Sequence, residues 1–89
     1  MKEKKEKTQK TKKAVAIKYE IEKDEAPRVI AKGQNLIAEK MEEIANKYNI
    51  HIERNPELAD QLYRLSVNQE IPEELYEAVA KILVYVYNL

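Results

Sequence analysis

The sequence is poor in the residues from which enzyme and metal sites are usually built. No cysteine is present, so disulfides, thiolate nucleophiles and thiolate metal ligands are excluded. The one histidine, His51, cannot supply the usual zinc ligand sets without cysteines, and we expect its side chain to be solvated. The one glycine, Gly33, excludes a glycine-rich phosphate loop, and the one serine, Ser66, lacks the context of a nucleophile elbow. We therefore predict a protein that is not an enzyme and has no catalytic residue, metal, cofactor or small-molecule substrate.

A long apolar run is also absent. The longest uninterrupted one covers residues 82–87, far short of the roughly 20 residues that span a bilayer. The Lys-rich start is not followed by the apolar stretch of a secretion signal. The sequence therefore predicts no membrane span and a cytoplasmic location.

Charge is divided unevenly along a chain that is neutral as a whole. Residues 1–13 contain seven lysines and two glutamates, which leaves fourteen acidic and nine basic side chains in residues 14–89. The first segment has no apolar side chain after Met1, so ordering it would cost backbone entropy without any burial to offset the cost. We predict a disordered Lys-rich tail at residues 1–13 and a single folded domain at residues 14–89.

The first half of this domain shows the period of β-strands. Apolar side chains alternate along residues 14–21, which predicts a half-buried strand. The charged stretch of residues 22–27 ends in Ala26-Pro27, where proline favours a turn or an exposed loop. A second strand is predicted at residues 28–32, ended by Gly33 in a positive-φ conformation.

A helical period follows from Asn35. The apolar side chains at 4-3-4 spacing, expected to face the core, are Ile37, Met41, Ile44 and Tyr48. Asn49 is predicted to end this helix in the left-handed conformation. Ile50 and Ile52 on either side of His51 predict a third short strand.

Two further helices complete the domain. Asn55-Pro56 predicts the start of a short helix with Leu58, Leu62 and Leu65 facing inward. Pro72 and the two glutamates after it predict the start of a last helix, which continues to Leu89. The predicted fold is α+β, with a small mixed sheet of about three strands packed against three helices.

The last helix has more apolar surface than one core contact consumes. One apolar stripe consists of Leu75, Val79, Ile82 and Val86, and a second consists of Tyr76, Ala80, Leu83 and Tyr87. Of the six tyrosines, we expect Tyr76, Tyr85 and Tyr87 at the surface, among acidic or apolar neighbours. This setting favours a protein partner and weighs against a nucleic acid that stacks on aromatic rings.

Three long strings of residues resemble a known family. They are AVAIKYE at 14–20, APRVIAKGQNLIAEKMEEIA at 26–45 and NPELADQLYRLSVNQEIPEELYEAVAKILVYVY at 55–87. In this order they resemble the cytoplasmic C-terminal domain of the FlhB/YscU export-switch proteins of type III secretion, over nearly all of residues 14–89. The resemblance implies a bacterial protein of flagellar export that works by docking.

The chain departs from that family where the family cleaves itself. The family has a self-cleaving Asn-Pro-Thr-His turn before the Ala-Val-Ala strand, and the matching positions here hold Gln9, Lys10, Thr11 and Lys12. Only the threonine agrees, so self-cleavage is not expected. The resemblance also implies a stand-alone domain without the family's membrane-embedded region and without its preceding strand, which would leave residues 14–20 at an open sheet edge.

The resemblance further implies a binding surface. Family members are thought to read early export substrates through a small apolar patch, whose matching positions are Ala26, Pro27, Ala80 and Leu83. We therefore predict a non-catalytic protein-binding module that docks export substrates or export-apparatus proteins. Two alternatives stay open: the second apolar stripe completes the core or packs on a second copy, or the protein is a small regulatory or nucleic-acid-associated protein that uses its basic tail.

Overall fold

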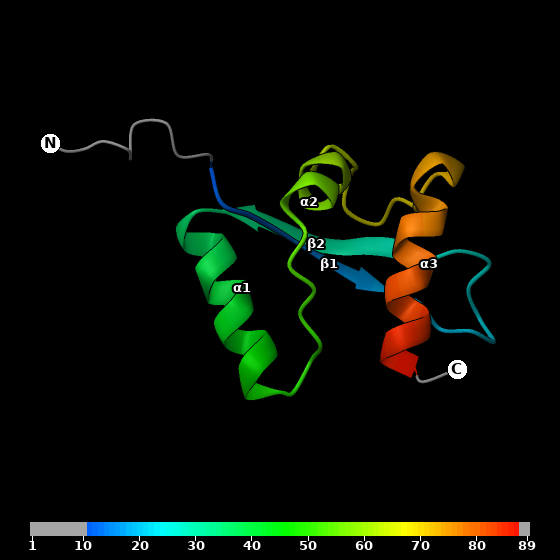
Figure 1. The fold of residues 1–89 in the computed structure, drawn as a ribbon, viewed down its shortest axis with the longest axis horizontal. Helices are drawn as coiled ribbons and strands as arrows, with labels where there is room; N and C mark the ends of the chain where they lie inside the picture. The colour runs from blue at the N-terminus through cyan, green and yellow to red at the C-terminus, as the bar shows by residue number, and fades with distance from the viewer. Residues whose placement is uncertain (1–10, 88–89) are drawn as a thin grey trace, which may run out of the picture.

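The computed structural model describes residues 11–87, which form two strands and three helices (Figure 1). The elements are β1 (Lys13–Lys18), β2 (Arg28–Gln34), α1 (Leu36–Lys47), α2 (Pro56–Tyr63) and α3 (Glu73–Tyr87). The disorder predicted for residues 1–13 falls mainly on residues 1–10, which lie outside the described part. The first strand begins one residue earlier and ends three residues earlier than predicted.

The sheet contains two antiparallel strands, so the prediction of a mixed sheet of about three strands is wrong. Residues 50–52 form no strand, because the amide of Ile50 donates to the carbonyl oxygen of Ala45 at the end of α1 (2.8 Å). The outer edge of β2 is taken by the chain before α3: the amide of Val29 donates to the carbonyl oxygen of Gln69 at 3.0 Å. The α+β class itself is confirmed.

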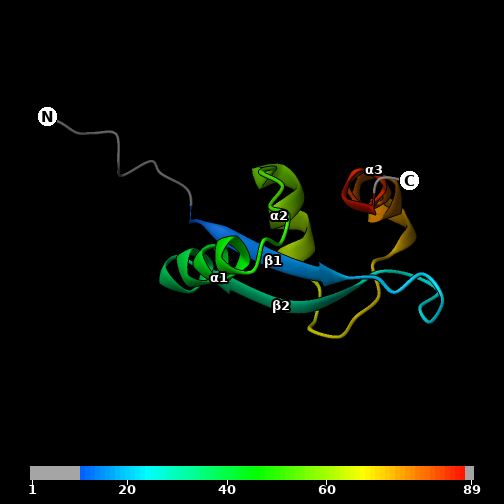
Figure 2. The same cartoon turned by 90° about the horizontal axis from the view of Figure 1, so that it is seen from below.

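The helices are distributed along the length of the two strands. Figure 2 shows α2 and α3 on the same side of the sheet, and Figures 1 and 2 place α1 and α3 toward opposite ends of it. The buried core lies between the strands, α2 and α3, and consists of Val29, Leu58, Leu62, Ile71 and Val79. Leu65 packs against this core, so the inward face predicted for the short helix is confirmed.

The face predicted to be buried on α1 is covered only in part. Ile37, Ile44 and Tyr48 are 58%, 46% and 66% exposed, whereas the neighbouring Ala38 is fully buried. The predicted face still reaches the sheet at Gly33, where the side chains of Ile37 and the half-buried Met41 lie over the strand. Ile44 and Tyr48, farther along the helix, stay largely in solvent.

Gly33 is required for close packing and not for a positive φ. It lies inside β2, and no glycine of the described residues has a positive φ. A Cβ atom at this position would stand 2.2 Å from Cγ2 of Ile37, so only glycine fits beneath α1. The turn into α1 is made by Asn35 at φ 55°, while Asn49 at φ 58° confirms the predicted left-handed residue after that helix.

Both ends of α2 are capped by side chains. Asn55 Oδ1 accepts a hydrogen bond of 3.1 Å from the amide of Leu58, which confirms the predicted N-cap. At the other end, Lys32 Nζ from β2 donates to the carbonyl oxygens of Tyr63 and Leu65, each at 2.9 Å. A cation at the carboxyl end of a helix is favourable, and here it also ties α2 to the sheet.

Glu42 joins three segments that are distant in sequence. Its carboxylate accepts hydrogen bonds from Lys12 Nζ and from an Arg54 guanidinium nitrogen, each at 3.2 Å. Partial burial by itself raises the pKa of the Glu42 carboxyl, but the bonds and charges of Lys12 and Arg54 outweigh it. The pKa is therefore held below its ordinary value of 4.5.

Candidate docking groove

One wall of the groove is the chain that leaves β1. Tyr19 and Ile21 extend beyond the last paired residue of the strand, and a tight turn follows at once. The amide of Glu20 donates to Asp24 Oδ2 at 2.9 Å, and the amide of Asp24 donates to the carbonyl oxygen of Glu20 at 2.7 Å. These two bonds close the turn on itself, directly after Tyr19.

Pro27 forms the floor of the groove. The segment 22–27 is a loop, as predicted, but Pro27 is not exposed, since its side chain is less than 2% accessible. Its carbonyl oxygen accepts a hydrogen bond of 2.8 Å from the amide of Ile71, just before α3. Proline also fixes its own φ, so this part of the groove is rigid.

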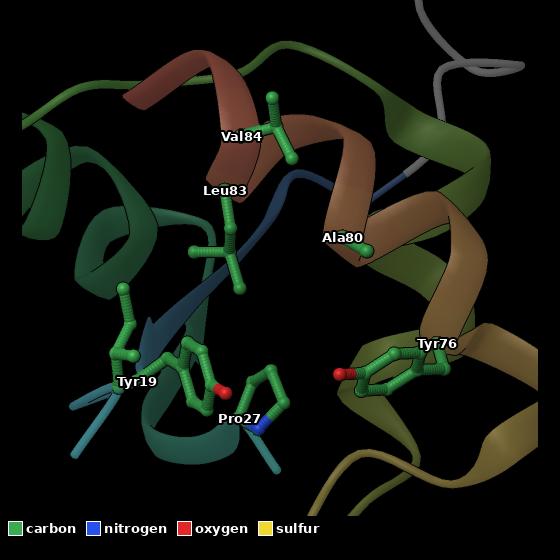
Figure 3. A pocket seen from close by; sticks show the side chains of 7 residues that line it. Tyr19, Pro27, Tyr76, Ala80, Leu83 and Val84 are labelled. Atoms are coloured by element: carbon green, nitrogen blue, oxygen red, sulfur yellow. The ribbon is translucent and has the colours of Figure 1, made fainter. Parts of the chain in front are cut away.

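The opposite wall is formed by α3, from three residues of its second apolar stripe together with Val84. Tyr76, Ala80, Leu83 and Val84 face Tyr19, Ile21 and Pro27 across an open groove of about 140 Å³. Figure 3 shows Leu83 and Tyr76 pointing from α3 toward Tyr19 and Pro27, with the small Ala80 between them. Tyr76 and Val84 are 39% and 48% exposed, so both remain available at the rim.

The first stripe of α3 belongs largely to the core. Val79 is 1% exposed, and Leu75 and Ile82 pack against the buried cluster. Val86 departs from the prediction, because it is 43% exposed. Leu83 touches both regions: it packs against the core and also lines the groove.

The structure brings three of the four predicted site residues together. Pro27, Ala80 and Leu83 line the groove, whereas the half-buried Ala26 is not part of its lining. The sequence assigned Tyr19 and Ile21 to the buried face of a strand, and it gave Val84 no role. The charged residues that begin at Glu20 were the available sign that the strand ends before Tyr19.

His51 and Tyr85 meet each other outside this groove. Their ring centroids lie 5.2 Å apart, and Nε2 of the exposed His51 lies 3.1 Å from a carboxylate oxygen of Glu53. Tyr85 is 73% exposed, as predicted for a surface tyrosine. The side chain of Tyr87, predicted to belong to the second stripe, lies outside what the structure describes.

The lining of the groove is almost entirely apolar. It is made of aliphatic side chains, one proline ring and two tyrosines. Across residues 11–87, no cluster of histidine and carboxylate side chains is placed to hold a metal ion. Over the same residues, none of the helices is both long enough and apolar enough to cross a membrane.

In comparison with known sequences, residues 8–86 match the profile of the FlhB HrpN YscU SpaS family. The flagellar biosynthetic protein FlhB of Aquifex aeolicus (strain VF5) is 51% identical over 74 residues, which cover 82% of this chain and 21% of that protein. The uncharacterized protein YlqH of Bacillus subtilis (strain 168) is 42% identical over 77 residues, covering 86% of this chain and 83% of YlqH. The chain thus spans about a fifth of the FlhB relative but most of the YlqH relative.

Two solved structures share the fold. The crystal structure of the cytoplasmic domain of FlhB from Shewanella putrefaciens matches with a TM-score of 0.81 and 46% identity, covering 86% of this chain and 65% of that one. The PscU C-terminal domain matches with a TM-score of 0.79 and 28% identity, covering 84% of this chain and 96% of that one. Sequence and fold therefore point to the same group of proteins.

Proposed function

The chain belongs to the FlhB HrpN YscU SpaS family, and we propose that it acts in flagellar type III protein export as a non-catalytic docking module. Its partners are early export substrates or proteins of the export apparatus. It works in the cytoplasm, which is supported by its similarity to a solved cytoplasmic domain of FlhB. In that role it either occupies the place of the switch protein's own cleaved domain or competes with it.

The observation that carries this proposal is the apolar groove between α3 and the start of β2. An apolar side chain of a partner enters between Leu83 and Pro27, with Tyr19 and Tyr76 at the sides. Burying one Leu or Phe side chain there contributes about 1.5–3 kcal/mol. Affinity also benefits from rigidity, because walls already held in place lose little entropy on binding.

The docking module does not cleave itself. The family's self-cleaving Asn-Pro-Thr-His turn is replaced by Gln9, Lys10, Thr11 and Lys12. Without the histidine and the proline, the side-chain attack on the backbone that the family uses has no counterpart. The contribution to export is therefore binding.

The proposal is tested by calorimetric titration of the purified protein with purified early flagellar export substrates. Val84→Asp places a charge in the groove at a side chain that is 48% exposed, so folding is little affected. Ile44→Asp is the matched control, because Ile44 on α1 is 46% exposed and lies outside the groove. We expect Val84→Asp to weaken binding at least tenfold and Ile44→Asp to leave it unchanged. Equal affinities of both variants and the wild type contradict the proposal.

A further inference from the structure

The apolar groove is bordered by acidic side chains along its first wall. Glu20 and Glu22 alternate with the groove residues Tyr19 and Ile21 in the sequence. The tight turn brings the carboxylate of Asp24 back to the amide of Glu20 at 2.9 Å. The loop of residues 19–27 contains four acidic side chains and one basic side chain. Lys18 forms an ion pair of 3.8 Å with Glu20, but both side chains are about half exposed, so this wall keeps a net negative charge.

The second wall carries negative charge on the same helical face as the groove. Glu73 and Glu77 stand three residues before Tyr76 and Ala80, and residues three apart are neighbours on a helix surface. The Glu77 carboxylate is 87% exposed, and its ion pair with Lys81 is 4.0 Å long and open to solvent. Such a pair neutralises little of the charge that an approaching partner meets.

Charges are closer to balanced toward the other end of the sheet. Lys12 and Lys13 stand where β1 begins and pair with Glu42 and Asp60, and α1 carries two lysines beside three glutamates. Figures 1 and 2 show that this end is opposite to α3. The domain is therefore electrically asymmetric, with the groove at its acidic end.

We propose that the partner segment in the groove carries lysine or arginine side chains next to its apolar anchor. This inference rests on the proposed function, because it specifies the chemistry of the segment that docks in the same groove. The apolar anchor fills the space between Leu83 and Pro27. The basic side chains lie over Glu20 and Glu22 on one wall and over Glu73 and Glu77 on the other. Opposite charges at the rim raise the association rate and reject acidic segments.

Two other occupants fit the charges and the lining less well. A second copy of the chain, docked groove to groove about a two-fold axis, would bring two acidic rims together. The chain's own Lys-rich residues 1–13 have the right charge, but after Met1 they contain no apolar side chain to fill the groove. A basic and apolar segment of another protein satisfies both requirements.

The test uses the full chain and three synthetic peptides of about twelve residues, compared by fluorescence anisotropy. The first has a central Leu-Phe pair with two lysines on each side, the second replaces the lysines by glutamates, and the third keeps the lysines but replaces Leu-Phe by Ala-Ala. We expect the first peptide to bind at least tenfold more tightly than either of the others at low salt. The preference over the glutamate peptide should shrink at high salt, because exposed charges are screened.

Removing charge from the rim without changing side-chain size makes the test specific to the groove. The double variant Glu73→Gln/Glu77→Gln should lower the preference for the lysine peptide at least threefold. The matched double variant Glu39→Gln/Glu43→Gln on α1 should leave it unchanged, because it removes the same charge at the opposite end of the domain.

The outcomes separate this inference from the proposed function. If the lysine and glutamate peptides bind equally and Val84→Asp weakens both, the groove docks segments but the inference about charge is wrong. If neither peptide binds while early export substrates bind and Val84→Asp weakens them, the proposed function stands and the inference is wrong. If the Ala-Ala peptide binds as tightly as the first, the attraction is charge alone and the inference fails.

Two further measurements examine the other occupants. Sedimentation equilibrium that finds a dimer, lost in Val84→Asp, assigns the groove to a second copy and overturns the inference. The triple variant Lys4→Gln/Lys5→Gln/Lys7→Gln decides the role of the chain's own tail. If it raises the affinity of both anchored peptides, the tail occupies the groove and the inference is likewise overturned.

Discussion

The amide of Ile71 donates a hydrogen bond of 2.8 Å to the carbonyl oxygen of Pro27. This bond joins the chain just before α3 to the residue just before β2, so the two walls of the groove meet at their base. Both partners are buried: Ile71 is 4% exposed, and the Pro27 side chain is below 2%. The shape of the groove is thus fixed by the same contacts that hold the core.

Pro27→Ala tests whether the groove floor is part of the core. Removing the buried ring leaves a void and frees the unfolded chain, so we expect a loss of about 1–2 kcal/mol in the free energy of unfolding. Urea denaturation followed by circular dichroism measures this loss. Pro56→Ala is the control, because Pro56 is exposed at the start of α2. An equal loss in both variants would show that the buried ring contributes nothing.

Gly33→Ala tests the close approach of α1 to β2. The added Cβ would overlap with Cγ2 of Ile37, so we expect a loss of about 1–3 kcal/mol in the free energy of unfolding. In a double-mutant cycle with Ile37→Ala the loss should become smaller, because the overlapping methyl group is gone. A loss that is the same in both backgrounds would contradict the proposed contact.

Glu42→Gln tests the link between Lys12, Arg54 and α1. The folded-state pKa of Glu42 is lowered, so its contribution to stability is present above the ordinary value of 4.5 and is lost as pH falls through the folded-state value. We therefore expect wild type to exceed Glu42→Gln in stability at about pH 7 and this difference to shrink toward about pH 3. Glu43→Gln is the control, since Glu43 is 75% exposed and its ion pair is with Lys40. A stability difference between wild type and Glu42→Gln that grows as the pH falls would contradict the lowered pKa of Glu42.

Prolonged incubation of the purified chain tests the absence of self-cleavage. Mass spectrometry should show a single species at 10.4 kDa after days at neutral pH. The residues at the family's cleavage position are Gln9 and Lys10, so a pair of fragments divided there would contradict the expectation.

Much of the fold follows from local sequence signals. The cap at Asn55, the inward leucines of α2 and the start of α3 each depend on neighbouring residues, so the sequence contains the information. The buried face of α1 does not follow in the same way. That helix carries apolar side chains on more than one side, and tertiary packing decides which of them are covered: Ala38 is buried, and Ile37 and Met41 lie over Gly33.

The third strand and the Lys32 cap show the same limit. Ile50 alternates with Ile52, yet its amide is used by the end of α1, and periodicity does not report such competition. From the sequence, Lys32 is an ordinary lysine of a strand. Its role as a cap becomes visible only in the structure, where α2 lies beside it. Both outcomes depend on partners that are distant in the sequence.

Only the α3 wall of the groove could be predicted from the periodicity of the sequence. The second stripe of α3 exceeded what one core contact needs, which marked Ala80 and Leu83 from periodicity alone. Tyr19 and Ile21 could not be assigned, because strand pairing ends at Lys18 and their place opposite α3 depends on contacts between residues that are distant in the sequence.

Methyl-labelled NMR during titration with an early export substrate shows where the substrate binds. Docking in the groove predicts that the methyl signals of Ile21, Ala80, Leu83 and Val84 shift together, while those on α1 stay in place. The exposed apolar side chains of α1 are Leu36, Ile37 and Ile44, and they form the competing surface. Shifts confined to α1, with the groove signals unmoved, would contradict docking in the groove.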